Sequence, residues 1–308
     1  MWVVATSIFW AGLGAILIKS HFLPKSLPKL LGRSLYWVGV PLQILVLTRK
    51  SNFSSAFWLP PLITVAVLLL GLGLASGSLY LKTSLHLPSH SYLTKRAGGG
   101  SFVLAAILGN TGFIGLAIVP AIVDRAYLTW IVLYGVTHNL LGSYGLGVFL
   151  ASYFGRKQRS WWIQLRDLVS VPSLWAFAIG WCSHSIQLPA PIESLLQTSI
   201  LFVVPAAFIS IGMQLCQLQG AKTLQSAIIP TGLKMLVLPG IAGYGLTLIG
   251  LSGDARLALV LMSGMPTAFA SLILAEEFDL DRQVAASSIV LSTVLLPLMI
   301  PLWLAVFS

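Results

Sequence analysis

Long apolar runs separated by short polar connections make up almost the whole of this 308-residue chain. Each run is close to the roughly 20 apolar residues that a helix needs to cross a bilayer. Strands of a membrane barrel would be shorter and would alternate, so the runs predict helices. They cover residues 2–18, 34–48, 56–81, 101–123, 127–154, 168–186, 196–217, 223–250, 256–276 and 284–307. We therefore expect an all-α membrane protein with ten transmembrane helices.

The composition excludes a sizeable soluble domain. Only 8% of the residues are charged, whereas soluble domains carry about 25%. The net charge of +10 does not indicate a nucleic-acid partner, because the basic residues lie in the connections between apolar runs. Cys182 and Cys216 lie inside apolar runs, which predicts neither a disulfide framework nor a metal site. Residues 2–18 have their basic flank behind them, at Lys19, and are interpreted as a first span rather than a cleaved signal.

The distribution of Lys and Arg predicts the orientation in the membrane. Thirteen of them lie in the connections after the first, third, fifth, seventh and ninth runs, and four lie in the alternate connections. Cytoplasmic connections carry the excess of basic residues. We therefore expect a multi-pass protein of the plasma (inner) membrane with both its N- and C-termini outside.

The two halves of the chain share landmarks in the same order. Three pairs of residues lie 164 to 166 positions apart: Gly14 with Gly180, Pro24 with Pro189, and Pro41 with Pro205. This spacing predicts one five-helix repeat over residues 1–154, a short cytoplasmic connector over 155–167 and a second repeat over 168–308. Because five is odd, the second repeat enters the membrane in the opposite direction, an arrangement common among secondary transporters.

The fourth and ninth runs are both interrupted near their middle. The fourth holds Gly109-Asn110-Thr111-Gly112, and the ninth holds Gly264-Met265-Pro266-Thr267. In a helix interior Gly costs roughly 1 kcal/mol and Pro about 3 kcal/mol. Within the bilayer, freed backbone groups are tolerated only inside protein or beside a water-filled cavity. Interruptions at matching positions of two repeats are the best sequence indication of a transport site.

Four segments carry a resemblance to a known family. The segments are Gly109–Leu116, Met265–Ala268 followed by Leu274–Glu277, Leu291–Leu295 and Val38–Pro41. In their order and spacing they resemble motifs of the auxin efflux carrier family. This family of PIN-like membrane transport proteins includes bacterial malonate-permease-type carriers. The sequence departs from the family where Ala117 replaces a Pro, and at residues 268–270, where an Asn is common.

The resemblance implies two inverted five-helix repeats in which helices four and nine are broken and cross near the midplane. It implies a scaffold of helices one, two, six and seven, a homodimer, and a moving core that works by an elevator-like motion. It also implies organic anions, including carboxylates, as substrates.

The interruptions supply most of the candidate binding residues. Asn110, Thr111 and Gly112 lie where a half-helix begins, and the partial positive charge of such an end attracts a carboxylate. Met265, Pro266 and Thr267 supply the crossing partner. The alternative is that these residues only satisfy and kink the broken backbone.

Four polar residues within other runs have two possible roles. Gln43 either faces the crossover or binds a neighbouring helix. His138 and Asn139 contribute to binding or proton coupling, or else to packing. Lys234 pairs with a substrate charge or a helix end, or extends toward the interface. Asp and Glu lie at run ends or in connections, which disfavours a sodium site built on carboxylates.

These features predict a secondary transporter of small organic anions, without a cofactor or bound metal. A sodium-coupled carrier of the bile-acid-symporter type and a non-transporting membrane sensor or scaffold stay open as alternatives. A lipid-modifying membrane enzyme is disfavoured, because the five histidines do not pair with acids at a recognisable spacing. The predicted partners are the substrate, the bilayer and a second copy of the chain.

Overall fold

The computed structural model describes residues 2–20, 24, 26–50, 57–84, 96–155, 162, 166, 169–217 and 224–308, and its named elements within these residues are all helices. The first half contains α1 (Trp2–Lys19), α2 (Leu27–Ser34), η1 (Leu35–Gly39), α3 (Val40–Arg49), α4 (Leu59–Ser84), α5 (Arg96–Ile107), η2 (Thr111–Gly115), α6 (Leu116–Ile118), η3 (Val119–Ala121), η4 (Arg125–Tyr127), α7 (Leu128–Thr137), η5 (His138–Gly147) and α8 (Val148–Phe154). The second half contains α10 (Pro172–Ser183), α11 (Ala190–Gln217), α12 (Leu224–Gly232), η7 (Leu233–Val237), α13 (Leu238–Leu248), α14 (Gly253–Ser263), α15 (Phe269–Glu277) and α16 (Arg282–Phe307).

The prediction of an all-α membrane protein is confirmed. Helices cover each of the predicted apolar ranges. Five helical stretches of the described residues are long and apolar enough to cross a bilayer: Leu30–Arg49, Leu59–Leu81, Ala190–Gln214, Leu224–Leu248 and Arg282–Phe307. Large apolar side chains also cover the outer surface, as at Phe202 and Leu248, which are 72% and 88% exposed. The total of ten crossings, the inverted repeat, the orientation and the homodimer stay predictions.

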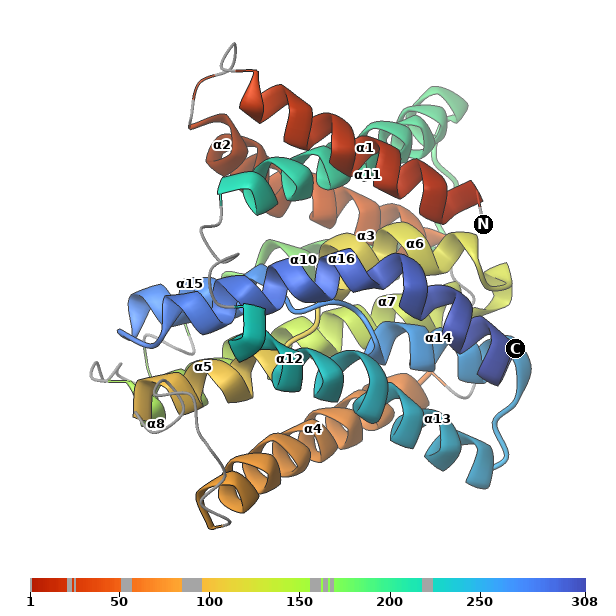
Figure 1. Ribbon diagram of the computed structural model, residues 1–308. Helices are drawn as coiled ribbons and strands as arrows, with labels where there is room; N and C mark the ends of the chain where they lie inside the picture. The colour runs from red at the N-terminus through yellow and green to blue at the C-terminus, as the bar shows by residue number, and fades with distance from the viewer. Residues whose placement is uncertain are drawn as a thin grey trace.

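The helices form two groups that meet at the interruptions. α1 packs along α11 and α3 packs along α10, and Figure 1 shows α1, α2 and α11 together at one edge of the molecule. α4 lies at the opposite edge, and α5, α7, α14 and α16 lie between these edges. Both termini lie at the same end of the helices in Figure 1. We call α1, α2, η1, α3, α10 and α11 the outer group, and the remaining helices the inner group.

Two glycines allow α1 and α11 of the outer group to pack closely. A Cβ atom on Gly14 of α1 would overlap the backbone of Ile209 in α11. A Cβ atom on Gly212 of α11 would overlap the backbone of Ala11 in α1. The two helices therefore pack backbone against backbone, as small residues permit in membranes.

Among the described residues, four stretches of wider, π-helical turns interrupt the regular helices, namely η1, η2, η5 and η7. η1 ends one residue before Val40 and two before Pro41, and η7 ends two residues before Pro239. A proline has no N–H to donate and clashes with the carbonyl four residues earlier, and a wider turn relieves that clash. η5 is rich in glycine instead, and η2 begins directly after the first break. η1, η2 and η5 carry side chains of the site described next.

Candidate functional site

The two interrupted helices cross at their breaks and pair through their backbones. α5 ends at Ile107 and α14 ends at Ser263, and the residues after each form an isolated antiparallel bridge between Gly109 and Thr267. Asn110 N donates to Pro266 O at 2.7 Å, and Ala268 N donates to Leu108 O at 2.9 Å. Backbone groups freed by one break are thus satisfied by the other, as an apolar environment requires.

Each member of the bridge also binds a side chain from a neighbouring helix. Gly109 N lies 3.3 Å from Nε2 of His138, at the start of η5. Thr267 N donates to Ser292 Oγ of α16 at 3.0 Å, and Thr267 Oγ1 donates to Ala105 O of α5 at 3.0 Å. His138 and Ser292 thus hold the two breaks in the same way from two different helices.

The half-helices that follow the two breaks differ in whether a side chain caps their first amides. Asn110 caps η2, because its Oδ1 accepts from Phe113 N at 3.2 Å and from Ile114 N at 3.5 Å. This cap leaves the Asn110 amide nitrogen directed away from the helix. α15 begins at Phe269 behind Ala268, which provides no side-chain cap. The first amides of a helix have no partner within it, so this end presents backbone donors and a partial positive charge.

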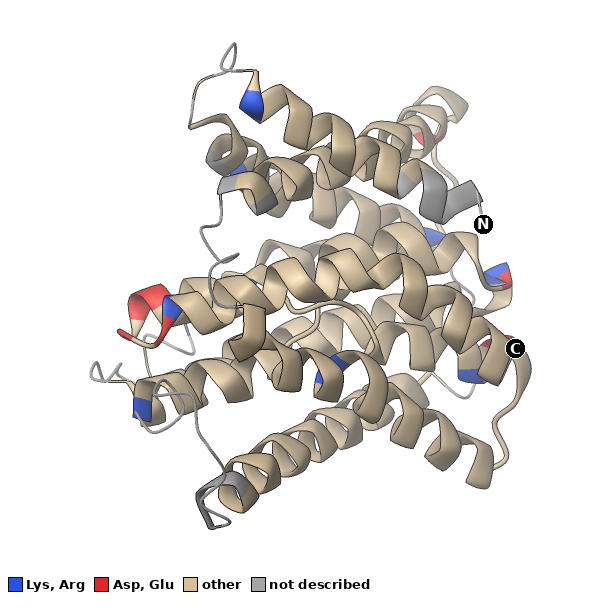
Figure 2. Ribbon diagram, viewed as in Figure 1, with Lys and Arg blue, Asp and Glu red and all other residues tan. Residues whose placement is uncertain are grey.

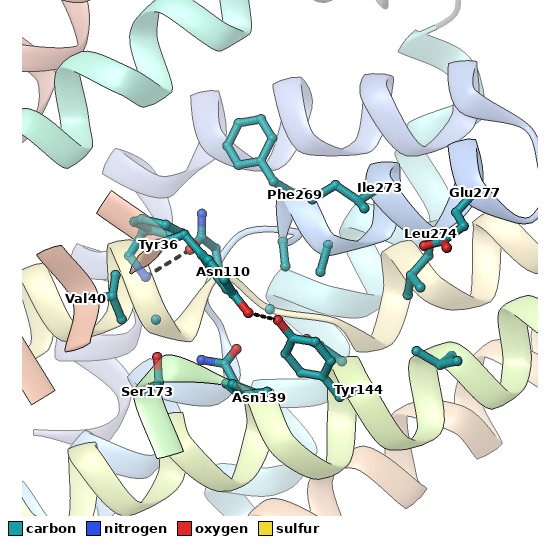
Figure 3. A pocket seen from close by; sticks show the side chains of 18 residues that line it. Tyr36, Val40, Asn110, Asn139, Tyr144, Ser173, Phe269, Ile273, Leu274 and Glu277 are labelled. Atoms are coloured by element: carbon teal, nitrogen blue, oxygen red, sulfur yellow. Dashed lines mark hydrogen bonds between the residues drawn. The ribbon is translucent and has the colours of Figure 1, made fainter. Parts of the chain in front are cut away.

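A cavity of about 230 Å³ lies against these two helix starts (Figure 3). Its inner wall comes from the breaks, η5 and α15, and its outer wall comes from Tyr36, Val40, Val171 and Ser173 of the outer group. The hydroxyls of Tyr36 and Tyr144 hydrogen-bond across the cavity between the two groups. The cavity therefore lies at the boundary between the two groups.

The lining of the cavity is mostly apolar, with polar groups concentrated near the breaks. Asn110, Asn139, Ser143 and Ser173 supply amide and hydroxyl groups. The charged residue of the lining is Glu277, which Figure 3 shows at the end remote from Asn110, beyond Leu274. The groups of the lining that carry partial positive charge are the helix starts and the amide donors. An anion would be repelled from the Glu277 end and favoured at the Asn110 end.

The structure brings only some of the predicted residues to the cavity. Asn110, Gly112 and Asn139 line it. The other candidates are buried around the crossover without lining the cavity, namely Thr111, Met265, Pro266, Thr267, Gln43 and His138.

The structure shows the surroundings of three of these buried candidates. Gln43 donates to Leu116 O at 2.8 Å, which joins α3 to the half-helix after the first break. Met265 packs beside Gly115. The hydroxyl of Thr111 has no hydrogen-bond partner among the described residues.

Sequence reasoning missed the tyrosines and serines of the cavity. Tyr36 and Val40 are four residues apart, as are Asn139 and Ser143, so each pair shares a helix face. The spacing from Asn139 was therefore an available signal for Ser143. No comparable local signal connects Tyr36 with Tyr144, because that contact joins residues 108 positions apart.

No cluster of three or more His, Cys, Asp or Glu side chains suited to a metal ion occurs within the described ranges. Apart from the Glu277 carboxylate at the remote end, the polar side chains of the cavity are amides and hydroxyls, which can bind a substrate by hydrogen bonds. They do not form a nucleophile with an adjacent base.

Comparisons with known proteins point to membrane transport. Residues 156–304 match the family model described as "Membrane transport protein". A protein of Methanothermobacter thermautotrophicus named an uncharacterized transporter is 29% identical over 204 residues, which is 65% of each chain. The alignment thus spans just under two thirds of that relative. An uncharacterized transporter of Methanocaldococcus jannaschii is 27% identical over 288 residues, covering 89% of this chain and 88% of its own.

The family and the relatives are membrane transporters and not enzymes, which confirms the prediction that the chain is not an enzyme. Over residues 156–304 the chain is therefore similar to the membrane transport protein family, in agreement with the resemblance of its motifs.

Proposed function

We propose that the protein is a secondary carrier of small organic anions, carboxylates in particular, and that the cavity at the crossover is its substrate site. The observation that supports this most is the position of the cavity. It touches both helix breaks on one side and the outer group on the other. Carriers built on interrupted helices bind substrate at such breaks.

The chemistry of the cavity suits a small carboxylate. The Asn110 amide nitrogen and the first amides of α15 are donors for carboxylate oxygens. Apolar side chains such as Phe269 and Ile273 suit a short carbon skeleton. The volume of about 230 Å³ is below the roughly 300–1,000 Å³ of pockets for drug-sized ligands, which favours a small substrate.

The boundary position of the cavity also supports alternating access. The inner group carries both breaks, and the outer group supplies the opposite wall. An elevator-like displacement of the inner group along the outer group would carry the substrate across the membrane. The Tyr36–Tyr144 hydrogen bond would then form in one state and break in another.

Flux of labelled mono- and dicarboxylates into proteoliposomes tests the proposal. Wild type is expected to show saturable uptake of at least one of them. Asn110→Asp keeps an oxygen that caps Phe113 and Ile114 but places a negative charge in the cavity. We expect at least a tenfold loss of flux, about 1.4 kcal/mol, with little change in melting temperature.

The matched control is Gln283→Glu, which makes the same change of charge at an exposed position of α16 that does not line the cavity. It should transport like wild type. Equal flux in Asn110→Asp and wild type would show that the cavity is not the substrate site. Loss of wild-type flux on replacing sodium by choline would favour the sodium-coupled alternative. Saturable binding without flux would favour a sensor.

A further inference from the structure

A buried lysine that does not line the cavity contacts the crossover. Lys234 lies in η7 and is 1% exposed. Its Nζ donates at 2.6 Å to the carbonyl of Ser263, the last residue of α14. Figure 2 shows most charged residues near helix ends and one basic position midway along the run from α12 to α13, where Lys234 is the basic residue.

The same amine also lies against the other break. A Cβ atom built on Gly109 would be 2.9 Å from Lys234 Nζ and 3.0 Å from its Cε. Gly109 follows the end of α5 by two residues. The amine therefore lies between the C-terminal ends of α14 and α5, the two helices that precede the breaks. No acidic side chain of the described residues lies within ion-pair distance of it.

The groups around the amine are those that bind a cation. The C-terminal end of a helix carries roughly half a negative charge and carbonyls without partners in the helix. In carriers with interrupted helices, such ends and the unwound carbonyls coordinate sodium or a proton. A lysine ammonium is a compact point charge with three donors, which resembles a monovalent ion more closely than a guanidinium does.

We propose that the side-chain amine of Lys234 occupies the place of an alkali cation at the crossover, so that the protein assembles and works without binding sodium or potassium there. The inference deepens the proposed carrier function, because it assigns the coupling-ion position. Lys234 itself does not line the cavity, although Gly109, which lies beside its amine, does.

A plain helix cap is the competing explanation, since a lysine often binds the last carbonyls of a helix. The two explanations differ in what happens when the amine is removed. If Lys234 only caps α14, every uncharged replacement is equally harmful in all salts. If it replaces a cation, a small replacement vacates a site that sodium can fill, whereas a long apolar replacement does not.

The experiment compares full-length wild type, Lys234→Ser and Lys234→Met in detergent. Thermal unfolding is measured in sodium chloride and in choline chloride at equal ionic strength. Lys234→Ser opens the space and adds a hydroxyl, and Lys234→Met fills the space without charge. We expect sodium to raise the melting temperature of Lys234→Ser by about 3 °C, and to leave wild type and Lys234→Met unchanged.

Two results would overturn the inference. One is stabilisation of wild type by sodium relative to choline. The other is an identical response of the Ser and Met variants to the two salts. If Lys234→Ser cannot be purified, Lys234→Gln takes its place, because its amide oxygen can serve as a ligand.

Flux measured in parallel separates this inference from the proposed function. Sodium is expected to restore flux in Lys234→Ser at least fivefold over choline and to leave wild-type flux unchanged. An absence of carboxylate flux in wild type would refute the proposed function, while the thermal measurement would still decide whether Lys234 occupies a cation site.

Discussion

Asn110 illustrates how one side chain both stabilises the backbone and forms part of the cavity. Its oxygen accepts from two amides of η2, and its backbone N–H donates to Pro266 O across the crossover. These bonds fix its position, and its amide nitrogen remains available to a ligand. Binding groups held by such bonds lose little freedom when substrate arrives.

Ser292 supplies a test of how the second break is held. Ser292→Ala leaves the buried N–H of Thr267 without its acceptor, which costs about 1–3 kcal/mol. We expect a fall in melting temperature of several degrees. Ser288→Ala on the same helix removes only a bond to the carbonyl of Val284 and should cost clearly less. Thermal unfolding of both variants checks this, and equal losses would contradict it.

Gly112 lies directly beside a polar group of the cavity. A Cβ atom there would be 3.0 Å from Asn139 Nδ2, the end of a flexible side chain. Gly112→Ala should therefore displace Asn139 and raise the KM for substrate several-fold, without loss of melting temperature. Gly232→Ala has nothing within 4 Å and serves as the control. An unchanged KM in Gly112→Ala would show that Asn139 does not contribute to substrate binding.

At the residue scale, sequence reasoning found the interruption but only part of the cavity. Asn110 and Gly112 were predicted because polar and glycine residues in an apolar run are conspicuous. Thr267 was predicted for the same reason, yet its hydroxyl points to Ala105 O of α5. A side chain's direction depends on the neighbouring helix, which the local sequence does not contain.

At the scale of elements, the packing of α1 on α11 gives a prediction with an internal control. Gly14→Ala would push a methyl group into the backbone of Ile209, so the two helices must separate. Gly12, two residues earlier, has nothing within 4 Å of its Cβ position. Alanine there should be neutral or stabilising by up to about 1 kcal/mol, since it favours helix.

Thermal unfolding of Gly12→Ala and Gly14→Ala in detergent measures the difference. We expect a lower melting temperature only in Gly14→Ala, by at least ~2 °C, because overpacking costs about 1–3 kcal/mol. Equal melting temperatures would show that the helices adjust without cost.

The helices and their breaks were predictable, but the pairing of the breaks was not. Apolar length locates the helices, and Gly and Pro locate the interruptions. The Gly109–Thr267 bridge joins residues 158 positions apart, and no local pattern specifies it. The expectation that the breaks cross came from the family resemblance. The wide turns before Pro41 and Pro239 also depend on how each proline is accommodated.

For the whole molecule, the contact of Tyr36 with Tyr144 tests whether the two groups move relative to each other. Tyr36→Cys and Tyr144→Cys, combined in a chain with Cys182→Ser and Cys216→Ser, place thiols on the two sides of the boundary. A flexible bifunctional maleimide should abolish flux in the double variant, because a covalent link prevents the displacement.

Each single-cysteine variant treated with the same reagent is the control for modification of the cavity wall, and the linked double variant should lose clearly more flux than either. Flux that persists in the fully linked double variant would argue against an elevator-like motion. Measuring the linked fraction on a denaturing gel makes the comparison quantitative.

The crossover itself is held mainly by main-chain atoms. The bonds between Asn110 and Pro266 and between Ala268 and Leu108 involve only N–H and C=O groups, which every residue except proline supplies. Side chains that line the cavity, such as those of Ala268 and Ala270, can therefore be exchanged without dismantling the architecture. Specificity can diverge during evolution while the scaffold stays constant, so proteins with the same fold and low sequence identity can carry chemically different cargo.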